Sequence, residues 1–321
     1  MKSAEHSVTA KQMTRSLLPH RAEETLRQLV YRRNCALAPR RYRAELQRWY
    51  WLSTGRTCDL DHPRTVGEKI QWLKLYDSTP LKGRLADKFL VRQEIVERVG
   101  PEHLVPLLGV WDRADQIDFE ALPDAGVLKT THGSGWNIRF TDRRALNIPA
   151  TRRRLEGWLR TRAAMTGGFE LHYEFCEPRI ICEPLLHDDS GGLRDYKVMV
   201  FNGEVQFVVC FTGRFTPGFT MSTHLPDWSP APFHYGGPPA RPICPPRPAG
   251  LEQMLEIARE LAQGFALVRV DFYEANGQVY VGELTFTDSN GLTWFAPSRY
   301  DAELGERLVL PEKKPFRGVM L

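Results

Sequence analysis

The sequence predicts an α/β (α+β) fold, with helices first and antiparallel strands after them. Two observations lead to this prediction. Apolar residues recur at helical spacing between residues 21 and 100, whereas strand-like runs dominate from about residue 111 onward. Two Asn-Gly dipeptides, at 202–203 and 276–277, stand between apolar runs, which is the strongest short-range signal of a β-hairpin.

Helices are predicted where apolar side chains form one stripe. The clearest case is 85–100, where the stripe runs from Leu85 to Val99 and Gly100-Pro101 would end the helix. The predicted helices span residues 21–34, 41–52, 65–77, 85–100, 151–165 and 250–265.

Strands are predicted from short apolar runs bounded by turn residues. The run at 104–111 is expected to include an edge strand, and 179–186 reads as a buried strand. Residues 213–248 contain ten prolines, so we expect an ordered-to-mobile loop over a site there. The other predicted strands are 126–131, 136–141 and the hairpins 196–211 and 266–286.

Composition is that of a globular protein and excludes several classes. The chain has 321 residues, 42% of them hydrophobic, and this length suits two or three lobes. No apolar run approaches the ~20 residues of a membrane helix, and the polar start MKSAEHSVTAKQMTRS is unlike a signal peptide. The six cysteines form no CxxC pair. We therefore expect reduced thiols and a cytoplasmic protein.

The net charge of +4 is unevenly spread. Residues 1–50 contain eleven Lys or Arg against four Asp or Glu, which gives +7, so the rest of the chain sums to −3. Either this is a solvated helical face, or it attracts an anionic membrane or polymer. Nucleic acid is disfavoured as a partner because no known binding module accompanies the charge.

The stretch VLKTTHGSGWNIRFTD contains a first candidate site. Lys129 ends an apolar strand, and His132, Gly133, Ser134 and Gly135 follow it. A lysine beside a glycine-rich loop can hold phosphates, because the loop offers backbone N–H groups without side-chain bulk. An ordinary hairpin turn is the alternative, and His132 is then an exposed turn residue.

The last hairpin carries two acidic residues, Asp271 and Glu283, on adjacent strands. Carboxylates of this kind suit Mg²⁺, which prefers hard oxygen ligands. A two-residue Asn276-Gly277 turn would pair position 271 with 282 and turn Glu283 to the other face. An odd connection or a bulge would restore the pair, and we expect a three-residue turn with Gly277 in the left-handed conformation.

Further charged residues stand at the ends of predicted elements. Glu183 lies in the apolar run IICEPLL, where an unpartnered carboxylate costs free energy. It is either a capped strand end or a functional hinge. Taken singly, each of the other positions is more typical of a surface charge. They are Lys88, Lys197, Arg214 and Arg269, and Asp195 shares the predicted strand of Lys197.

In this order, the pieces resemble the ATP-grasp superfamily and, more closely, the TupA-like ATP-grasp family, which is associated with bacterial surface polysaccharide and teichuronopeptide synthesis. The resemblance covers residues 41 to about 305. It rests on GEKIQWLKLYD (67–77), LADKFLVRQEIVERVG (85–100), LLGVWD (107–112), VLKTTHGSG (127–135), DYKVMVFNGE (195–204) and RVDFYEANGQVYVGELTF (269–286).

The resemblance implies an ATP-grasp fold, in which the nucleotide is held between two antiparallel-sheet lobes. The implied parts are a helical N-terminal region (1–110), a lid subdomain with the glycine-rich loop (111–183) and a C-terminal subdomain (184–321). ATP and Mg²⁺ are the implied cofactors. The implied nucleotide-binding residues are Lys88, Lys129, His132, Gly133, Ser134, Gly135, Glu183, Leu185 and Asp195, with Glu183 and Leu185 at the adenine. The implied catalytic residues are Lys197, Arg214 and Arg269. The implied metal ligands are Asp271 and Glu283.

Two positions depart from the family pattern. Many ATP-grasp ligases have Asn two residues after the metal-binding Glu, where this chain has Thr285. The shorter hydroxyl side chain puts a third protein ligand in doubt. The motif TVGEK (65–69) carries Gly67 where the family pattern has Asn.

The resemblance implies an ATP-dependent carboxylate–amine ligase that works through an acyl phosphate. Its substrates would be a small-molecule or glycan-linked acid and amine, such as an amino acid and a uronic acid or amino sugar. Three alternatives stay open: an ATP-grasp kinase, a glycosyltransferase that uses Asp59-Leu60-Asp61 as a metal motif, and a non-catalytic polymer-binding protein.

Overall fold

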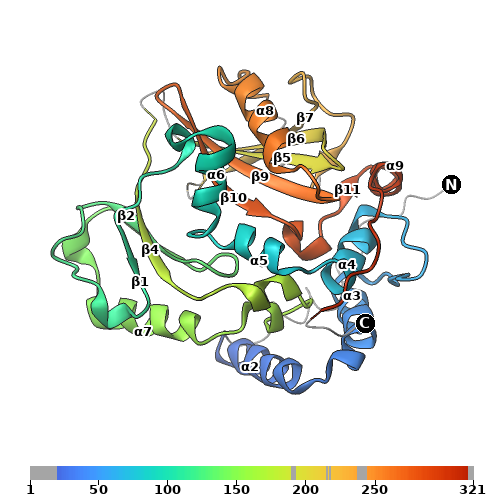
Figure 1. Cartoon of the computed structure of the whole chain (residues 1–321), viewed down its shortest axis with the longest axis horizontal. Coiled ribbons are helices and arrows are strands. Elements are labelled where there is room, and N and C mark those ends of the chain that lie inside the picture. The colour runs from blue at the N-terminus through green and yellow to red at the C-terminus, as the bar shows by residue number, and fades with distance from the viewer. Residues whose placement is uncertain (1–19, 189–192, 215, 217, 237–243, 317–321) are drawn as a thin grey trace.

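The computed structural model describes residues 20–188, 193–214, 216, 218–236 and 244–316. The chain begins with helices and continues into two antiparallel sheets (Figure 1). This arrangement confirms the predicted mixture of helices and antiparallel strands. No helix within the described residues is long and apolar enough to cross a membrane. The predicted subdomain boundaries stay a prediction.

The described part of the N-terminal region contains five α-helices. Three lie at expected positions, one was not predicted, and one covers only part of a predicted helix. The five helices are α2 (His20–Ala36), α3 (Tyr42–Thr54), α4 (Val66–Tyr76), α5 (Pro80–Ala86) and α6 (Val91–Val99). The helix predicted over 85–100 is therefore confirmed only from residue 91, and the prediction is wrong for its first part. Asp87 ends α5, and its Oδ1 accepts hydrogen bonds from the N–H groups of Phe89 and Leu90 at 2.8 and 3.0 Å. This side-chain cap starts a new helix and leaves Lys88 in the break.

The smaller sheet has four antiparallel strands in the order β1-β4-β2-β3. The strands are β1 (Gly109–Trp111), β2 (Gly126–Thr130), β3 (Asn137–Phe140) and β4 (Ile180–Pro184). The edge strand predicted within 104–111 is confirmed as β1. One face packs on α7 (Ile148–Leu159), which ends before the predicted 165. The other face of β2 carries Lys129.

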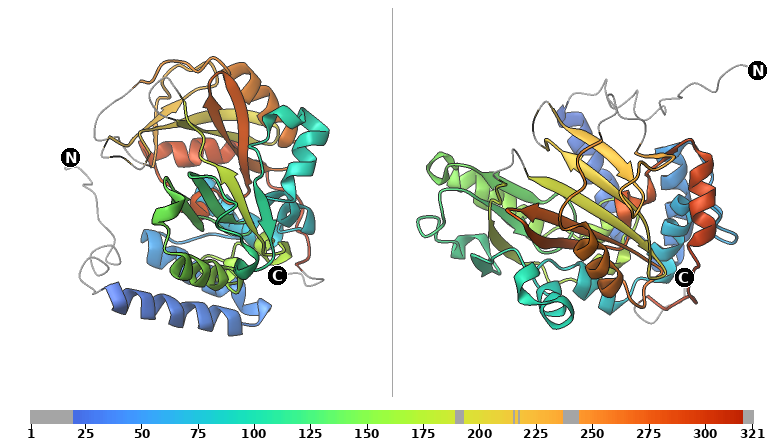
Figure 2. Two further views of the ribbon diagram at one scale, coloured as in Figure 1. Left: turned by 90° about the vertical axis from the view of Figure 1, so that its left-hand side faces the viewer. Right: turned by 90° about the horizontal axis from the view of Figure 1, so that it is seen from above.

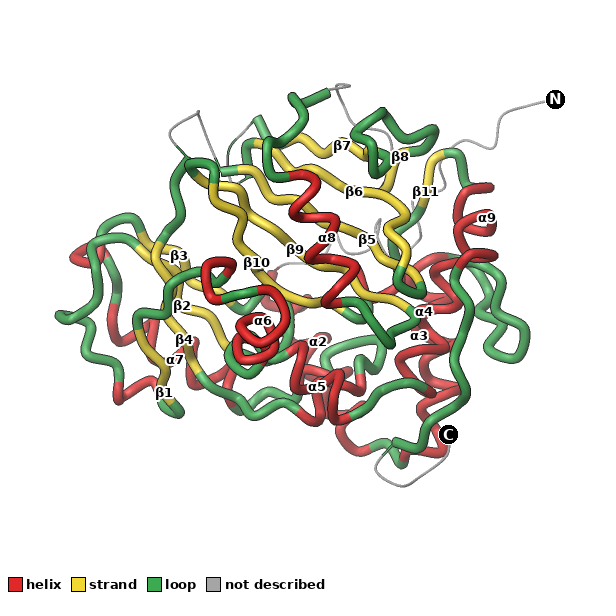
Figure 3. The backbone as a smooth tube through the Cα atoms, turned by 45° about the horizontal axis from the view of Figure 1, so that its top comes forward, coloured by secondary structure: helices red, strands yellow, loops and turns green. Residues whose placement is uncertain are grey.

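The larger sheet has five antiparallel strands in the order β10-β9-β5-β6-β7. Both predicted hairpins are present. The strands are β5 (Arg194–Phe201), β6 (Glu204–Thr212), β7 (Thr220–His224), β9 (Leu267–Ala275) and β10 (Gln278–Thr285). Helix α8 (Leu251–Leu261) lies across one face (Figure 3) and buries Val198, Val270 and their neighbours. Side chains at alternate positions therefore point to the opposite face.

The proline-rich stretch 213–248 is not wholly a loop. It contributes β7 to the large sheet, and β8 (His234–Tyr235) pairs with β11 (Phe295–Ala296). The prediction of a continuous loop is wrong for these parts, because β7 extends the ladder of β6. Residues 215, 217 and 237–243 of this stretch lie outside the described residues. Helix α9 (Arg299–Arg307) follows and packs against β11.

Candidate active site

The centre of the candidate site is a row of three charged side chains across the larger sheet. Lys197 of β5 stands opposite Asp271 of β9, and Asp271 stands opposite Glu283 of β10. Residues directly opposite in a ladder share one face. Because Val198 and Val270 point toward α8, the three charged side chains lie on the other face. The predicted meeting of Asp271 and Glu283 is present.

A bulge brings this pair together, and the expected three-residue turn is wrong. Asn276 and Gly277 form a two-residue turn, both with positive φ (52° and 78°), between the paired residues Ala275 and Gln278. The register shifts between Val281 and Glu283, so Gly282 is the extra residue. One bulged residue moves every later side chain to the other face.

Arg269 precedes Asp271 by two residues in strand β9, and its side chain contacts both carboxylates. Its Nε and Nη2 donate to the two oxygens of Asp271 at 2.6 and 2.8 Å, and Nη2 also lies 3.1 Å from Glu283 Oε1. Nη1 binds Asp288. A two-pronged arginine–carboxylate contact is among the strongest charge-assisted arrangements. Arg269, a predicted catalytic residue, therefore lies between the two carboxylates and holds both in position.

Asp195 and its partners extend the site along β5. Asp195 is buried and binds Arg214, while Lys197 lies 3.3 Å from Asp195 and also binds Asp271. The Arg214 side chain is 43% exposed, in contrast to the nearly buried Lys197. Arg214, a predicted catalytic residue, thus lies at the outer end of this row, where its side chain is accessible to solvent.

The smaller sheet contains an ion pair between two residues that were predicted to bind the nucleotide. Lys129 of β2 binds Glu183 of β4, and Arg92 of α6 lies 3.9 Å from the same carboxylate. Val127 pairs with Glu183. Because Lys129 follows Val127 by two residues in β2, Lys129 and Glu183 lie on the same face of the sheet. Glu183 is therefore a partnered carboxylate. Leu185 follows directly after β4 and is half-buried.

The glycine-rich loop is tied to the larger sheet through Lys88. The Lys88 ammonium donates to the Gly133 carbonyl at 2.8 Å and lies 3.6 Å from Glu283. Ser134 and Gly135 are exposed, and both Gly133 and Gly135 have positive φ (78° and 74°). A cation thus links the tip of the loop with a carboxylate of the other sheet.

His132 does not lie at an exposed turn. Its side chain is buried, its ring packs edge-on against Trp136 with centroids 5.0 Å apart, and Nε2 lies 3.2 Å from the Thr161 carbonyl. Burial lowers the pKa of His132. His132, which was predicted to bind the nucleotide, thus points toward the body of the protein and supports the loop.

The two carboxylates differ in their electrostatics: burial raises the pKa of Asp271 despite Arg269 and Lys197, whereas nearby cations outweigh burial at Glu283. Burial alone would raise the pKa of Glu283, but Lys88, Arg269, Lys197 and Lys129 outweigh burial and hold its pKa below the usual range. Glu283 is therefore ionised at neutral pH. A concentration of cations around one carboxylate is the environment that triphosphate oxygens need.

The sequence prediction missed a second buried cluster behind Arg269. Lys74 of α4 is fully buried, and its ammonium donates to Gln71 Oε1 at 2.8 Å and to Asn290 O at 2.7 Å. Asn290 and Ser289 have positive φ (59° and 48°) within the short turn Asp288–Gly291. Lys74 therefore holds a strained turn whose first residue contacts Arg269. Polar residues three apart in the otherwise apolar helix KIQWLKLY were the available signal.

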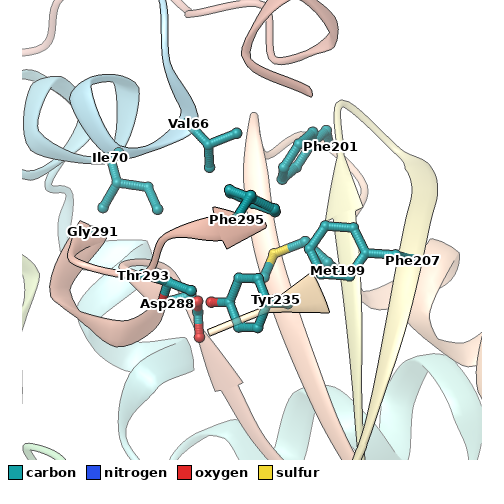
Figure 4. A pocket seen from close by; sticks show the side chains of 11 residues that line it. Val66, Ile70, Met199, Phe201, Phe207, Tyr235, Asp288, Gly291, Thr293 and Phe295 are labelled. Carbon is teal, nitrogen blue, oxygen red and sulfur yellow. The ribbon is translucent and has the colours of Figure 1, made fainter. Parts of the chain in front are cut away.

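A small cavity adjoins this turn (Figure 4). It has a volume of about 10 Å³, room for about one water molecule. Apolar side chains such as Met199 and Phe295 form most of the lining, and Asp288 and Tyr235 lie together at one side. Gly67, a departure from the family pattern, also lines the cavity. A Cβ at Gly67 would lie 2.9 Å from the Tyr50 hydroxyl, so this helix start tolerates no larger residue without a shift.

The acidic pair Asp59 and Asp61, which the glycosyltransferase alternative would need, serves a local turn. Asp59 Oδ1 accepts from the N–H groups of Asp61 and His62, both at 2.9 Å, and Asp61 pairs with Arg43. These contacts explain both aspartates as turn and surface residues.

The donor set of the main site suits Mg²⁺. No group of three or more His, Cys, Asp and Glu side chains with a metal-binding arrangement occurs in the described part of the chain. Mg²⁺ nevertheless commonly takes only one or two protein carboxylates and completes its shell with water and phosphate oxygens. Asp271 and Glu283 fit this requirement. Thr285 Oγ1 accepts from Arg269 at 3.1 Å and is engaged there.

Comparison with known proteins supports the family. The TupA-like ATP-grasp family model matches residues 68–309. No curated protein matches the chain. Similar solved structures include the ATP-grasp ligase PsnB complexed with minimal precursor, at 12% identity over 65% of this chain and 54% of that chain, with a TM-score of 0.37.

Two further solved structures are similar at the same level. They are D-alanine–D-alanine ligase from Bacillus anthracis complexed with ATP (13% identity, 63% and 53% of the two chains, TM-score 0.37) and D-cycloserine synthetase DcsG (15%, 72% and 72%, 0.38). The chain spans about half the length of PsnB and of the D-alanine–D-alanine ligase. The family match confirms the predicted ATP-grasp fold and an ATP-grasp enzyme: this chain belongs to the TupA-like ATP-grasp family.

Proposed function

We propose that this enzyme is an ATP-dependent carboxylate–amine ligase that forms an amide through an acyl phosphate. The observation that supports it best is the row Lys197–Asp271–Glu283 together with Lys88, which contacts both Glu283 and the glycine-rich loop. Two carboxylates that could bind a metal and several cations that could bind phosphates are then gathered beside the glycine-rich loop. By analogy with the family, the acid and amine are an amino acid and a uronic acid or amino sugar of a bacterial surface polysaccharide.

The first half of the reaction is phosphoryl transfer. Lys129 and Lys88 neutralise the phosphates of ATP, the exposed Ser134-Gly135 tip covers them, and Glu183 and Leu185 lie at the adenine. Asp271 and Glu283 would hold Mg²⁺, which would spread the charge that develops on the phosphates. An oxygen of the substrate carboxylate attacks the γ-phosphorus as the bond to the β-phosphate oxygen breaks. This gives an acyl phosphate and ADP.

The second half is amide formation. The amine nitrogen attacks the acyl carbon, the C–O bond to phosphate breaks, and inorganic phosphate and a proton leave. We assign the exposed Arg214 to the tetrahedral oxyanion and the buried Arg269 to the ordering of the carboxylates near it. Asp195 and Lys197 hold these groups in place. We place the reaction in the cytoplasm, where ATP is available.

The alternative with the same nucleotide site is a kinase that leaves a stable phosphoester. Hydroxylamine trapping separates the two activities. The enzyme, MgATP and hydroxylamine would be incubated with pools of amino acids and uronic acids, and hydroxamates and nucleotides would be read by mass spectrometry. A hydroxamate with ADP identifies acyl-phosphate chemistry and names the acid. A stable phosphorylated product without hydroxamate would overturn the ligase proposal.

The assignment of the metal carboxylates has its own test. Asp271→Asn should abolish ADP formation while the melting temperature shows that the fold is retained. Asp61→Asn is a matched control, because Asp61 is an exposed aspartate at a surface turn. Near-normal turnover by Asp271→Asn would remove this site.

A further inference from the structure

A cavity lies at the base of the glycine-rich loop, where α7 ends beside α2 (Figures 1 and 2). It has a volume of about 180 Å³, which is room for several water molecules. Side chains of both charges line it, together with a short apolar wall. The charged residues are Arg160, Arg162 and Glu174, and the apolar residues are Leu159, Ala163 and Pro178. The cavity therefore suits a small polar molecule.

His132 is one link between this cavity and the candidate active site. It lines the cavity, and the next residue, Gly133, accepts a hydrogen bond from Lys88 at 2.8 Å. The Lys88 ammonium in turn lies 3.6 Å from Glu283. The base of the glycine-rich loop is therefore a wall that the cavity and the site have in common.

Tyr173 is a second link. It lies in the short helix η6 (Leu171–Phe175), is half-buried and lines the cavity. Burial raises the pKa of Tyr173, and the charges of Glu283 and Arg269 also act on its hydroxyl. This hydroxyl has no hydrogen-bond partner among the described residues. Because polar groups inside proteins normally find a partner, the Tyr173 hydroxyl is available to a ligand.

The two arginines of the cavity keep N–H donors for an anion. Arg162 uses Nε, at 3.2 Å, and Nη2 to bind Glu174, whose side chain is 4% exposed, which leaves the N–H groups of Nη1. Arg160 is 78% exposed and makes one contact, with Glu156 at 3.4 Å. Guanidinium groups with spare donors are well suited to a carboxylate.

We propose that this cavity binds the amine substrate of the ligase and that this substrate is an amino acid. Its carboxylate would bind Arg160 and Arg162, and its amine would lie at Tyr173, on the side of the active site. A uronic acid has a carboxylate without an amine, and an amino sugar has an amine without a carboxylate, so the amino acid alone matches both ends of the cavity.

This assignment rests on the proposed ligase function and gives it a direction. The nitrogen of the amino acid forms the bond to the acyl carbon as the bond from that carbon to phosphate breaks, and the proton of the amine leaves to solvent. The second substrate is then the acid that ATP activates. The carboxylate of the amino acid stays at the arginines and does not react.

Saturation-transfer NMR tests the cavity without turnover. The full chain with Mg²⁺ and ADP would be mixed with the common amino acids, with glucosamine and with glucuronate. We expect at least one amino acid to bind and the two sugars to bind much more weakly. Tyr173→Phe and Arg160→Met should each weaken amino-acid binding by about tenfold, as expected for a lost hydrogen bond to a charged group.

Matched controls lie outside the cavity. Arg153→Met removes an exposed arginine of α7 that does not line the cavity. Tyr300→Phe removes the hydroxyl of a half-buried tyrosine of α9. Both should bind amino acids like the unchanged protein. Circular dichroism of each variant checks that the fold is retained.

Turnover separates this inference from the ligase proposal itself. Once hydroxylamine trapping has named the acid, Tyr173→Phe should raise KM for the amino acid about tenfold and leave KM for ATP unchanged. No hydroxamate from the unchanged protein would overturn the ligase proposal and the role as amine with it, whereas the NMR measurement still decides whether the cavity binds amino acids.

Three results would overturn the assignment of the cavity while the ligase proposal stands. The first is binding of no amino acid, and the second is amino-acid binding that Tyr173→Phe and Arg160→Met leave unchanged. The third is a hydroxamate formed on the carboxylate of the amino acid itself, which would make the amino acid the activated acid and not the amine.

Discussion

Glu283 lies directly opposite Asp271 because Gly282 is bulged out of strand β10. Without the extra residue, position 282 would face Asp271 and the Glu283 carboxylate would point to the other face of the sheet. The bulge is therefore the local feature that assembles the acidic pair. Bulges beside active sites commonly aim a side chain in this way.

Gly282→Ala should lower the rate of ADP formation by about tenfold, because a misplacement of about 1 Å is costly in an active site. An added Cβ would lie 2.8 Å from the Tyr273 ring and 3.4 Å from the Asp271 carbonyl. The two strands would have to separate beside the carboxylates. Gly157→Ala is the control, since its added Cβ would meet no atom within 4 Å beyond its chain neighbours and the backbone of its own helix. Turnover of Gly282→Ala that equals this control would contradict the role of the bulge.

The sequence predicted the hairpins and the meeting of Asp271 and Glu283, but it favoured a three-residue turn over the bulge that brings the pair together. Asn-Gly turns are local signals, so 202–203 and 276–277 could be identified directly. The bulge at Gly282 depends on contacts between strands, and the break at Asp87 depends on a side-chain cap within an apparently continuous helix. Neither changes the apolar periodicity on which the prediction relied.

The buried cluster around Lys74 was missed for a different reason. Its partner Asn290 lies 216 residues away, and no local pattern connects the two positions. A fully buried lysine also contradicts the usual reading of lysine as a surface residue. Only the tertiary structure shows that Lys74 holds the turn that begins at Asp288, which in turn contacts Arg269.

Lys129→Ala should reduce ADP formation by at least about 100-fold, the usual effect of removing a group that stabilises transferring charge. Arg92 then remains near the Glu183 carboxylate, at 3.9 Å. Arg144→Ala, an exposed cation of the same lobe, should leave the rate unchanged. The measurement is ADP release with saturating substrates. An equal effect of both substitutions would show that general charge, and not the position of Lys129, matters.

Unfolding stability should rise with pH between about 7.5 and 8.5 because of Lys74. Burial lowers the pKa of Lys74 from 10.5 to about 7. In this window the unfolded chain holds the proton and the folded chain does not, so a rise in pH favours the folded state. The contribution is about 1 kcal/mol over this one pH unit.

Urea unfolding at the two pH values checks this expectation, with Lys74→Met as the comparison. Methionine keeps the length of the side chain without a titrating group, so the pH-dependent part should disappear. Asp288, whose pKa burial raises to about 7, contributes the opposite slope at lower pH and little in this window. An unchanged slope in Lys74→Met would show that another group causes it.

Arg214→Met should separate acceptor chemistry from nucleotide binding. Arg214 is the exposed partner of Asp195, and Lys197 remains beside Asp195 after the substitution. A half-exposed ion pair contributes little to stability, so the fold and ATP affinity should stay close to normal. Loss of an oxyanion contact should instead lower the rate of amide formation by about 100-fold, with ADP still formed in the presence of hydroxylamine. Arg299→Met, which removes an exposed arginine from α9, serves as the control. If Arg214→Met loses ATP binding as well, this arginine belongs to the nucleotide site and not to the acceptor.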